Sequence, residues 1–516
     1  MVNFVLFQGG TGSAVAKAFM HLVAMGFIDR NQTVHVQLCD KDGTSGDTAL
    51  AKTLITTVSN LSNPNHFKPG NGENENKAVF TTPITVDEFD FSAALGELNK
   101  RSDNLKGLLV SPTKQKEDTL LMDAFFSETQ QNSGIDVGFK GGAARGAVIY
   151  SYLLENEGRL QDNRHKILNS IETYLNDHKN EHCRVFVVGS IFGGTGAAMF
   201  LKTVEKVKAL DKDRVHVAGA LMLPYFTFQA TEECEIKPSR FWPKAMTALE
   251  GYAENKNLVK QFADDADGIL DRLYITVQPN NELHYSAGPA VAGGKDQIRR
   301  TDFAEVVAAY YITDFINAAS GDNNCYAEGT RENPKSNVYT LYYGDVNDNN
   351  KLKLSCISTL DTRMAQMLSF CAVVCNMKYT WKTTVDKKKD DINWLKKIIK
   401  SSVIRSDFTN IKDVVGSYID ELFAYCASFV DFAKDLVFNG VRLDGEIDEE
   451  KCGDKYDLLD HDQVMNLYKV MVSLTGKNEP CGEKLLNEVL NFNSYCKFVT
   501  PRTARSALTS VFDDSR

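Results

Sequence analysis

Several common signatures are missing from this 516-residue sequence, and each absence removes a class of protein. No apolar run approaches the roughly 20 residues of a membrane-spanning helix, and no basic leader with a cleavage site opens the chain, which predicts a cytoplasmic protein. The 11 cysteines are odd in number and form no CxxC pair, so reduced thiols are expected. A G-x-x-x-x-G-K-[ST] loop and a G-x-S-x-G elbow are absent, which excludes P-loop proteins and nucleophile-elbow hydrolases.

Basic residues are also in the minority, with 58 Lys and Arg against 68 Asp and Glu and a net charge of −10. An acidic surface repels DNA phosphates, so no bulk nucleic-acid binding is expected. The hydrophobic fraction of 43% and the charged fraction of 24% are typical of a globular protein. A chain of this length is too long for one hydrophobic core, which predicts more than one domain.

Strand patterns and helix patterns alternate through the first part of the chain. The predicted strands are residues 2–7, 34–40, 106–112, a run that begins at residue 185, and residues 214–226 and 271–279. Alternation this regular predicts an α/β fold, with a Rossmann-like, mostly parallel sheet and helices on both faces. Such sheets bind ligands at the carboxyl ends of their strands.

The pattern also divides the chain into parts. Residues 1–296 are predicted to form the first domain, in which residues 60–77, rich in Asn, Gly and Pro, read as a surface loop or disordered insert. Residues 297–319 are apolar on nearly every side, which predicts a buried core helix. Residues 320–516 are predicted to form a second, largely helical domain that opens with a hairpin over 338–358.

Three glycine-rich stretches stand where helices are expected to begin: QGGTGSA from Gln8, GGAARG from Gly141 and FGGTGAA from Phe192. A strand that enters a helix through glycines directs free backbone N–H groups at one point, and the helix dipole favours phosphate there. One such stretch is usually a plain turn, whereas three in one α/β domain favour a nucleotide site. Hydroxyl donors could come from Thr11, Ser13 and Thr195.

Asp40, at the end of the second predicted strand, allows two interpretations. It could hold a ribose, which keeps an NAD(P)-dependent Rossmann oxidoreductase open, although the first stretch lacks the third glycine of the dinucleotide fingerprint. Alternatively, Asp40 and Asp42 could hold Mg²⁺ through water beside phosphates. The oxidoreductase interpretation leaves the second GGTG and the buried helix unexplained.

The order of these motifs resembles the tubulin/FtsZ superfamily over residues 1–320, with divergent bacterial and phage tubulin-like proteins as the nearer comparison. QGGTGSA is similar to that family's first glycine loop, and CDKD from Cys39 is similar to the acidic end of its second strand. GGAARG resembles the loop that senses the terminal phosphate, and FGGTGAA resembles the signature loop, usually GGGTG. Phe192 replaces the first signature glycine and is expected to narrow the approach on one side.

The resemblance implies a site for GTP or GDP with Mg²⁺. The residues that it assigns to the phosphates and their surroundings are Gln8, Gly9, Gly10, Thr11, Gly12, Ser13, Asp40, Gly141, Gly142, Ala143, Arg145, Gly193, Gly194, Thr195, Gly196 and Ala197. For the sugar and the base it adds Glu232, Glu233 and Gln297. Asp40 and Asp42 are the candidate magnesium ligands.

The resemblance also implies assembly with copies of the same chain, head-to-tail, into filaments, and an adaptor protein is a candidate partner. In the family, an N-x-D-x-x-D loop after the core helix reaches the next subunit's nucleotide and activates water. Here GDNN from Gly321 and GDVNDNN from Gly344 lack that spacing. Assembly-dependent GTP hydrolysis and a nucleotide-binding switch or scaffold that never hydrolyses are therefore both open.

Overall fold

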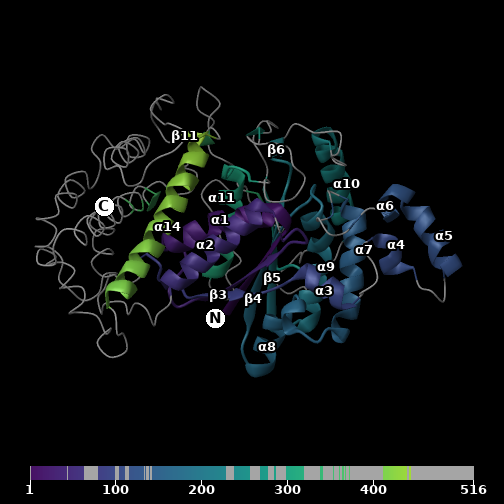
Figure 1. Cartoon of the computed structure of the whole chain (residues 1–516), viewed down its shortest axis with the longest axis horizontal. Helices are drawn as coiled ribbons and strands as arrows, with labels where there is room; N and C mark the ends of the chain where they lie inside the picture. The colour runs from purple at the N-terminus through teal and green to yellow at the C-terminus, as the bar shows by residue number, and fades with distance from the viewer. Residues whose placement is uncertain are drawn as a thin grey trace, which may run out of the picture.

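The computed structural model places a seven-stranded sheet at the centre of the chain, in the order β3-β2-β1-β4-β5-β7-β9 (Figure 1). Every neighbouring pair in this sheet is parallel. The strands are β1 (Val2–Gln8), β2 (Thr33–Cys39), β3 (Ile84–Asp87), β4 (Cys183–Ser190), β5 (Val215–Met222), β7 (Arg272–Thr276) and β9 (Val338–Thr340). The prediction of a mostly parallel α/β sheet is confirmed.

The structure describes most of the first 318 residues and shorter pieces after them. The described residues are 2–43, 45–62, 79–98, 104–110, 115–132, 134, 139, 142–227, 237–255, 258, 268–276, 284–285, 298–318, 338–340, 352–353, 360, 363–364, 367, 371, 411–438 and 441–442. No helix within these residues is long and apolar enough to cross a membrane.

The central strands are continuous apolar runs because both faces of the sheet are covered. All eight residues of β4 are buried, as are all residues of β1 after the first. Strands buried on both sides are typical of parallel sheets packed between helices.

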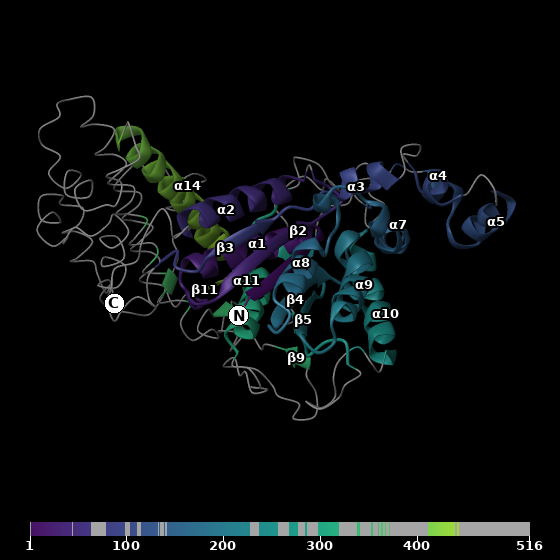
Figure 2. The same cartoon turned by 90° about the horizontal axis from the view of Figure 1, so that it is seen from below.

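Helices form a layer on each side of the sheet (Figure 2). One side carries α1 (Gly9–Ala24), α2 (Gly46–Ser62), α11 (Phe303–Asn317) and α14 (Ile411–Phe438). The other side carries α3 (Phe91–Leu98), α7 (Ala143–Asn156), α8 (Asn169–Asp177) and α9 (Thr195–Leu210). Helix α10 (Phe241–Glu254) contributes to both cores.

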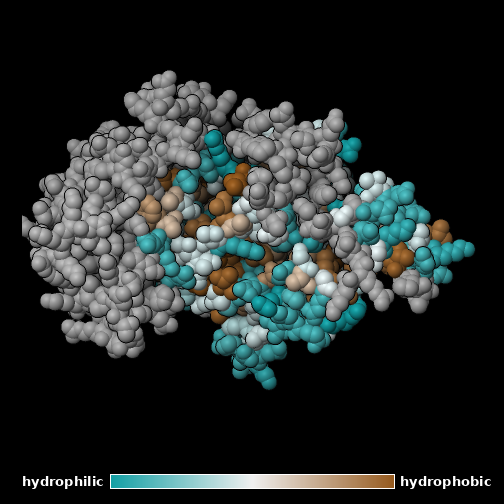
Figure 3. All heavy atoms as spheres, viewed as in Figure 1, coloured by the Kyte–Doolittle hydropathy of each residue, from teal (hydrophilic) through white to brown (hydrophobic). Residues whose placement is uncertain are grey.

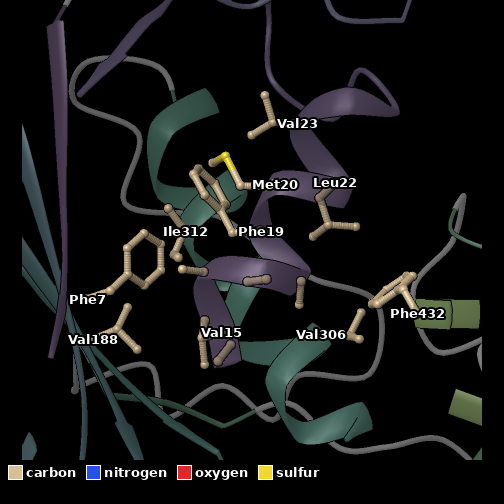
Figure 4. Packing of buried hydrophobic residues seen from close by; sticks show 14 of the residues in the cluster. Phe7, Val15, Phe19, Met20, Leu22, Val23, Val188, Val306, Ile312 and Phe432 are labelled. Carbon is tan, nitrogen blue, oxygen red and sulfur yellow. The ribbon is translucent and has the colours of Figure 1, made fainter. Parts of the chain in front are cut away.

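The α1 helix lies at the centre of the first layer. Phe7 from β1 and Ile312 from α11 pack with Phe19 of α1, and Phe432 of α14 belongs to the same cluster (Figure 4). A helix enclosed in this way is apolar around most of its circumference, and 14 of the 16 residues of α1 are buried.

The predicted core helix is confirmed, although it is shorter than residues 297–319. Its first turn carries a capping box, in which the Asp302 side chain accepts from Ala304 N at 2.8 Å and Glu305 accepts from Asp302 N at 3.0 Å. Twelve of its 15 residues are buried.

Three sequence expectations differ from the structure. Residues 106–112 were expected as a strand, which is wrong: α4 (Leu105–Leu109) is a helix, because Asn104 caps it at Gly107 N (2.9 Å) and Leu105 and Leu108 are buried one turn apart. Within residues 60–77, residues 60–62 belong to α2, and the rest lie outside the described residues.

The third difference concerns the expected hairpin over 338–358. Of its described residues, β9 pairs with β7 in the main sheet and β10 (Leu352–Lys353) pairs with β11 (Val441–Arg442), both in parallel. Strand β9 pairs with backbone groups of β7 that would otherwise be unpaired at the edge of the sheet. A second small pair joins β6 (Phe226–Thr227) and β8 (His284–Tyr285).

Candidate functional site

The sheet changes direction between β1 and β4, which are neighbours although the chain continues from β1 to β2 and from β4 to β5. At this point α1 leaves toward one face and α9 leaves toward the other. Parallel sheets bind ligands in the crevice that such a reversal opens at the carboxyl ends of the strands. The first and third glycine stretches both lie here.

The first glycine stretch is the start of α1, and not the loop that the sequence suggested, because the helix follows Gln8 directly. Gly9 has a φ of +71°, a left-handed conformation that side chains oppose. A Cβ at Gly9 would lie 3.0 Å from Gly196 N and 3.0 Å from the Thr195 Cβ. Bare backbone at Gly9 therefore lets the starts of α1 and α9 touch.

The α9 start is equally crowded on its inner side. A Cβ at Gly196 would lie 2.7 Å from Ser190 N and 3.2 Å from Gln8 O, so this glycine packs against both strands. A Cβ at Gly193 would lie 2.6 Å from the Ser190 Oγ. Gly194, the N-cap of α9, is partly exposed and has φ −82° and ψ −68°, which any residue can adopt.

Neither α1 nor α9 is capped by the side chain of its N-cap residue. The N-caps of α1 and α9 are Gln8 and Gly194, and neither makes a side-chain cap hydrogen bond. Helices α8 and α10 also begin without one, so the distinctive feature is that two uncapped starts meet at the switch point. Backbone N–H groups at helix starts and the helix dipoles suit an anion.

The α7 start lies beside α9. A Cβ at Gly146 would lie 2.8 Å from the Ala198 Cβ, so the first turns of α7 and α9 pack closely. Arg145 is 2% exposed, and its Nη2 donates to Phe139 O at 2.9 Å. Arg145 thus holds the chain that precedes α7, while Gly142 and Ala143 are partly exposed at the helix start.

Asp40, directly after β2, reaches the same region. Its carboxylate accepts from Thr195 Oγ1 at 3.2 Å, from Thr48 Oγ1 at 3.4 Å and from Asp42 N at 3.2 Å. Burial raises the pKa of Asp40 to about 6, against the opposing effect of these hydrogen bonds. Asp40 therefore links β2 to the first residue of α9.

Other predicted side chains are engaged within the protein. Gln8 is fully buried and donates to Thr203 Oγ1 at 2.6 Å. Ser13 is buried against Thr48, with 3.1 Å between their hydroxyl oxygens, and Thr11 and Gly12 are buried in the first turn of α1. The partly exposed residues of these stretches include Gly10, Gly193 and Ala197. The two stretches therefore expose mainly backbone atoms.

Residues 145–249 match a protein-family model described as tubulin-like. This part of the chain is similar to tubulin-like proteins. It contains β4, the glycine turn before α9, β5 and most of α10. The match and the parallel sheet support the assignment to the tubulin/FtsZ superfamily that the motif order predicted. No curated protein matches the chain.

Phe192 stands in the signature stretch of the tubulin-like segment, but it does not narrow the approach to the glycines. Its side chain is 2% exposed and packs against Phe241 (ring centroids 4.8 Å apart), Phe226 (5.6 Å) and Tyr225 (6.2 Å). An aromatic side chain at this place anchors the turn to α10 and to the chain after β5.

Sequence reasoning missed Arg299, which lies close to the first glycine turn. Its guanidinium donates to Asp47 at 3.3 Å, to the Tyr225 hydroxyl at 3.1 Å and to Gly10 O at 3.4 Å. It also lies over the Phe226 ring, 4.3 Å from the centroid. No short motif contains Arg299, and its position shortly before the core helix was the available signal.

Asp47 and Glu305, both buried, balance the charge of Arg299. Lys17 contacts Asp47 at 2.7 Å, and Arg299 Nη2 lies 3.8 Å from Glu305 Oε1. Burial alone would raise the pKa of Asp47, but Lys17 and Arg299 lower it overall. Burial raises the pKa of Glu305 to about 7, opposed by Arg299. These four residues, here called the Arg299 cluster, join α1, α2 and α11.

Four predicted site residues lie outside the described residues: Gly141, Glu232, Glu233 and Gln297. Within the described residues, no group of three or more His, Cys, Asp or Glu side chains is placed to hold a metal ion. The oxygen donors of Asp40 and Asp42 are of the type that Mg²⁺ prefers, and Mg²⁺ commonly takes one or two carboxylates with water and phosphate.

Proposed function

We propose that this protein binds GTP with Mg²⁺ in the cytoplasm and assembles head-to-tail with copies of itself. The observation that carries the proposal is the meeting of two uncapped helix starts, at Gly9 and Gly194, at the switch point of the sheet. Two helix dipoles that point at one place favour a polyanion such as a di- or triphosphate.

In this proposal the α1 and α9 backbones donate to the phosphates. Gly10, Gly193 and Gly194 are partly exposed and carry no side chain that would hold an anion away. The start of α7, at Gly142 and Ala143, approaches from the α9 side and contacts the terminal phosphate. Glu232, Glu233 and Gln297 remain the proposed contacts of the sugar and the base.

The acidic end of β2 is the proposed magnesium site. Asp40 and Asp42 supply carboxylates beside Thr195, whose hydroxyl already donates to Asp40. Mg²⁺ bound there would neutralise charge on the phosphates. The raised pKa of Asp40 fits a carboxylate that is held in a buried place and gains from a cation.

Self-assembly is the second part of the proposal, and it rests on the tubulin-like assignment. Contacts between opposite ends of identical subunits are heterologous and produce open filaments. Hydrolysis of GTP would be completed by a second subunit at that contact. Without an N-x-D-x-x-D loop in the sequence, a protein that binds GTP and assembles without hydrolysis is the other form of this proposal.

Gly194→Val tests the nucleotide site. Because Gly194 has an ordinary φ of −82°, valine adds a side chain at the helix start without backbone strain. The variant is expected to keep its melting temperature and to lose at least tenfold in GTP affinity, measured by calorimetry. The control is Gly251→Val, because a Cβ at Gly251 meets no atom within 4 Å.

Unchanged GTP affinity in Gly194→Val would remove the phosphate site from the glycine turns. A panel of GTP, ATP and NAD(P) tests the nucleotide, and preference for NAD(P) would favour an oxidoreductase. Pelleting with GTP and magnesium tests assembly, and phosphate release from the same sample separates the hydrolysing form from the other.

A further inference from the structure

A short helix at one end of the molecule exposes apolar side chains. Leu120, Leu121 and Phe125 of α5 (Gln115–Phe125) are 63%, 62% and 73% exposed. They are three of only seven large hydrophobic residues that are exposed in the described part of the chain. In Figure 3, brown atoms stand among teal ones at the right-hand end of the molecule, where α5 lies.

These side chains are not needed for the packing of the helices around them. The projection formed by α4, α5 and α6 (Glu128–Asn132) is closed at its base by a bridge between Asn104 and Gly134. Its interior holds Met122, the single buried residue of α5, and Gln131 of α6, which donates to Asp123 at 2.9 Å and to Phe126 O at 2.8 Å. The helix therefore presents Leu121 and Phe125, one turn apart, on a fixed support.

The surroundings of this apolar face are acidic. Residues 115–132 contain one lysine, two glutamates and two aspartates, a net charge of −3. Glu117 and Glu128 are exposed beside the apolar residues. A face of this kind is complementary to an apolar surface that carries positive charge, and such complementarity selects partners and speeds association.

One segment of this chain has that composition, although the chain as a whole is acidic. Residues 392–405, INWLKKIIKSSVIR, carry three lysines, one arginine and no acid, together with one tryptophan, one leucine, one valine and four isoleucines. The segment lies outside the described residues, but it ends six residues before α14 begins. Six residues span at most about 20 Å.

Helix α5 and helix α14, which follows residues 392–405 in the chain, lie far apart in the molecule. Both views place α5 at one end of the longest axis and α14 on the other side of the sheet and its helix layers (Figures 1 and 2). A second copy of the chain supplies residues 392–405 for a contact with α5. Each of the two copies then keeps one of its two contact regions available for a further copy. Heterologous contacts of this kind extend without closing.

We propose that the acidic apolar face of α5 docks on residues 392–405 of a second copy of this chain. The apolar core of the contact is formed by Leu120, Leu121 and Phe125, with Glu117 and Glu128 facing the lysines around it. The inference rests on the self-assembly in the proposed function, and it does not depend on the nucleotide.

The test uses the full chain and a labelled peptide of residues 392–405. The wild-type protein is expected to bind the peptide in fluorescence anisotropy, and L121E/F125E is expected to bind at least tenfold more weakly. Both residues are more than 60% exposed, so the variant is expected to keep its melting temperature and its GTP affinity. Leu50→Ser, at a 45% exposed position of α2, is the control that should bind normally.

Charge reversal identifies the occupant. E117K/E128K should weaken binding of the wild-type peptide, and a peptide with its three lysines replaced by glutamate should recover binding to this variant. In sedimentation velocity, L121E/F125E should also lower self-association of the full chain. Absence of peptide binding, equal binding by L121E/F125E, or no recovery on charge reversal overturns the inference, whereas loss of GTP binding alone overturns only the nucleotide proposal.

Discussion

Asp40 connects the end of β2 to the start of α9 through a single carboxylate. It accepts hydrogen bonds from Thr195, Thr48 and the backbone of Asp42, yet burial still raises its pKa to about 6 from an ordinary 3.8. At neutral pH this carboxylate is ionised in a place that disfavours its charge. The site therefore holds a group that destabilises the unliganded protein and that a cation would relieve.

The Asp40→Asn variant tests whether the ionised Asp40 carboxylate destabilises the folded protein. Between pH 4 and 6 the folded wild-type protein binds more protons at Asp40 than the unfolded chain does, so its stability falls as the pH rises through this range. Asparagine keeps an oxygen acceptor for Thr195 and has no charged form. The variant is expected to be more stable than wild type at pH 7.5, by up to about 3 kcal/mol, and about equally stable near pH 4.

Thermal unfolding at a series of pH values measures this difference, and GTP affinity with and without Mg²⁺ should show a weaker magnesium effect in the variant. If the stability of Asp40→Asn runs parallel to that of wild type between pH 4 and 6, the carboxyl does not titrate in this range.

Single residues of the candidate site could be predicted from the sequence where a short local motif contained them. Gly9 and Asp40 were selected from short patterns, and in the structure both contact the start of α9. Arg299 was missed because its partners come from three distant segments, and nothing adjacent in the sequence signals them. Phe192 was predicted to narrow the approach to the glycines, but its side chain packs against Phe241. The prediction was wrong because the sequence does not say in which direction a turn points its side chain.

At the scale of elements, the Arg299 cluster joins the start of α11 to α1 and α2. Asp47 and Glu305 are each 1% exposed at their side chains, and Arg299 pairs with both, whereas Lys17 pairs with Asp47. Removing one partner from a buried charged group leaves the others uncompensated, which costs more than the pair contributes.

Arg299→Met should therefore destabilise the protein by about 3 to 5 kcal/mol, measured by urea unfolding at pH 7.5. Lys202→Met is the matched control, because Lys202 is 51% exposed and pairs with Glu205 at the surface, where an ion pair contributes about 1 kcal/mol or less. A similar small loss in both variants would mean that the buried carboxylates are neutralised without Arg299.

The elements themselves followed from the sequence where periodicity was strong. The apolar runs of β1, β4 and β5 and the all-round apolar pattern of α11 left few alternatives. The strand prediction for residues 106–112 was wrong because a short apolar run is compatible with a strand or a helix. The hydrogen bond from Gly107 N to the Asn104 side chain stabilises the helix. The partner of β9 was missed because pairing joins residues far apart in the chain.

At the scale of the whole molecule, the described part of the C-terminal region shares a core with the N-terminal helices. His21 of α1 is enclosed by Tyr425, Phe429 and Phe432 of α14, with its ring centroid 4.5 Å from that of Phe432. Burial lowers the pKa of His21 to about 3, so it packs as a neutral ring. The α14 helix is therefore part of the layer that supports α1 and its glycine turn.

Phe432→Ala should remove about 3 to 5 kcal/mol from the free energy of unfolding, because Phe432 is 2% exposed within this core. Since α1 and α14 share the core, amide exchange in β1 and α1 should accelerate together with that in α14. Faster exchange confined to α14, with β1 unchanged, would show that α14 unfolds as a separate unit.

The contact between Gly9 and Gly196 also sets a rule for how this protein can change by mutation. A Cβ at Gly9 would lie 3.0 Å from Gly196 N, and a Cβ at Gly196 would lie 2.7 Å from Ser190 N and 3.2 Å from Gln8 O, so neither position has room for a larger residue. A library that randomises either position alone should return only glycine among folded members. The starts of α1 and α9 are thus expected to keep these two glycines together, although nothing in the linear sequence connects them.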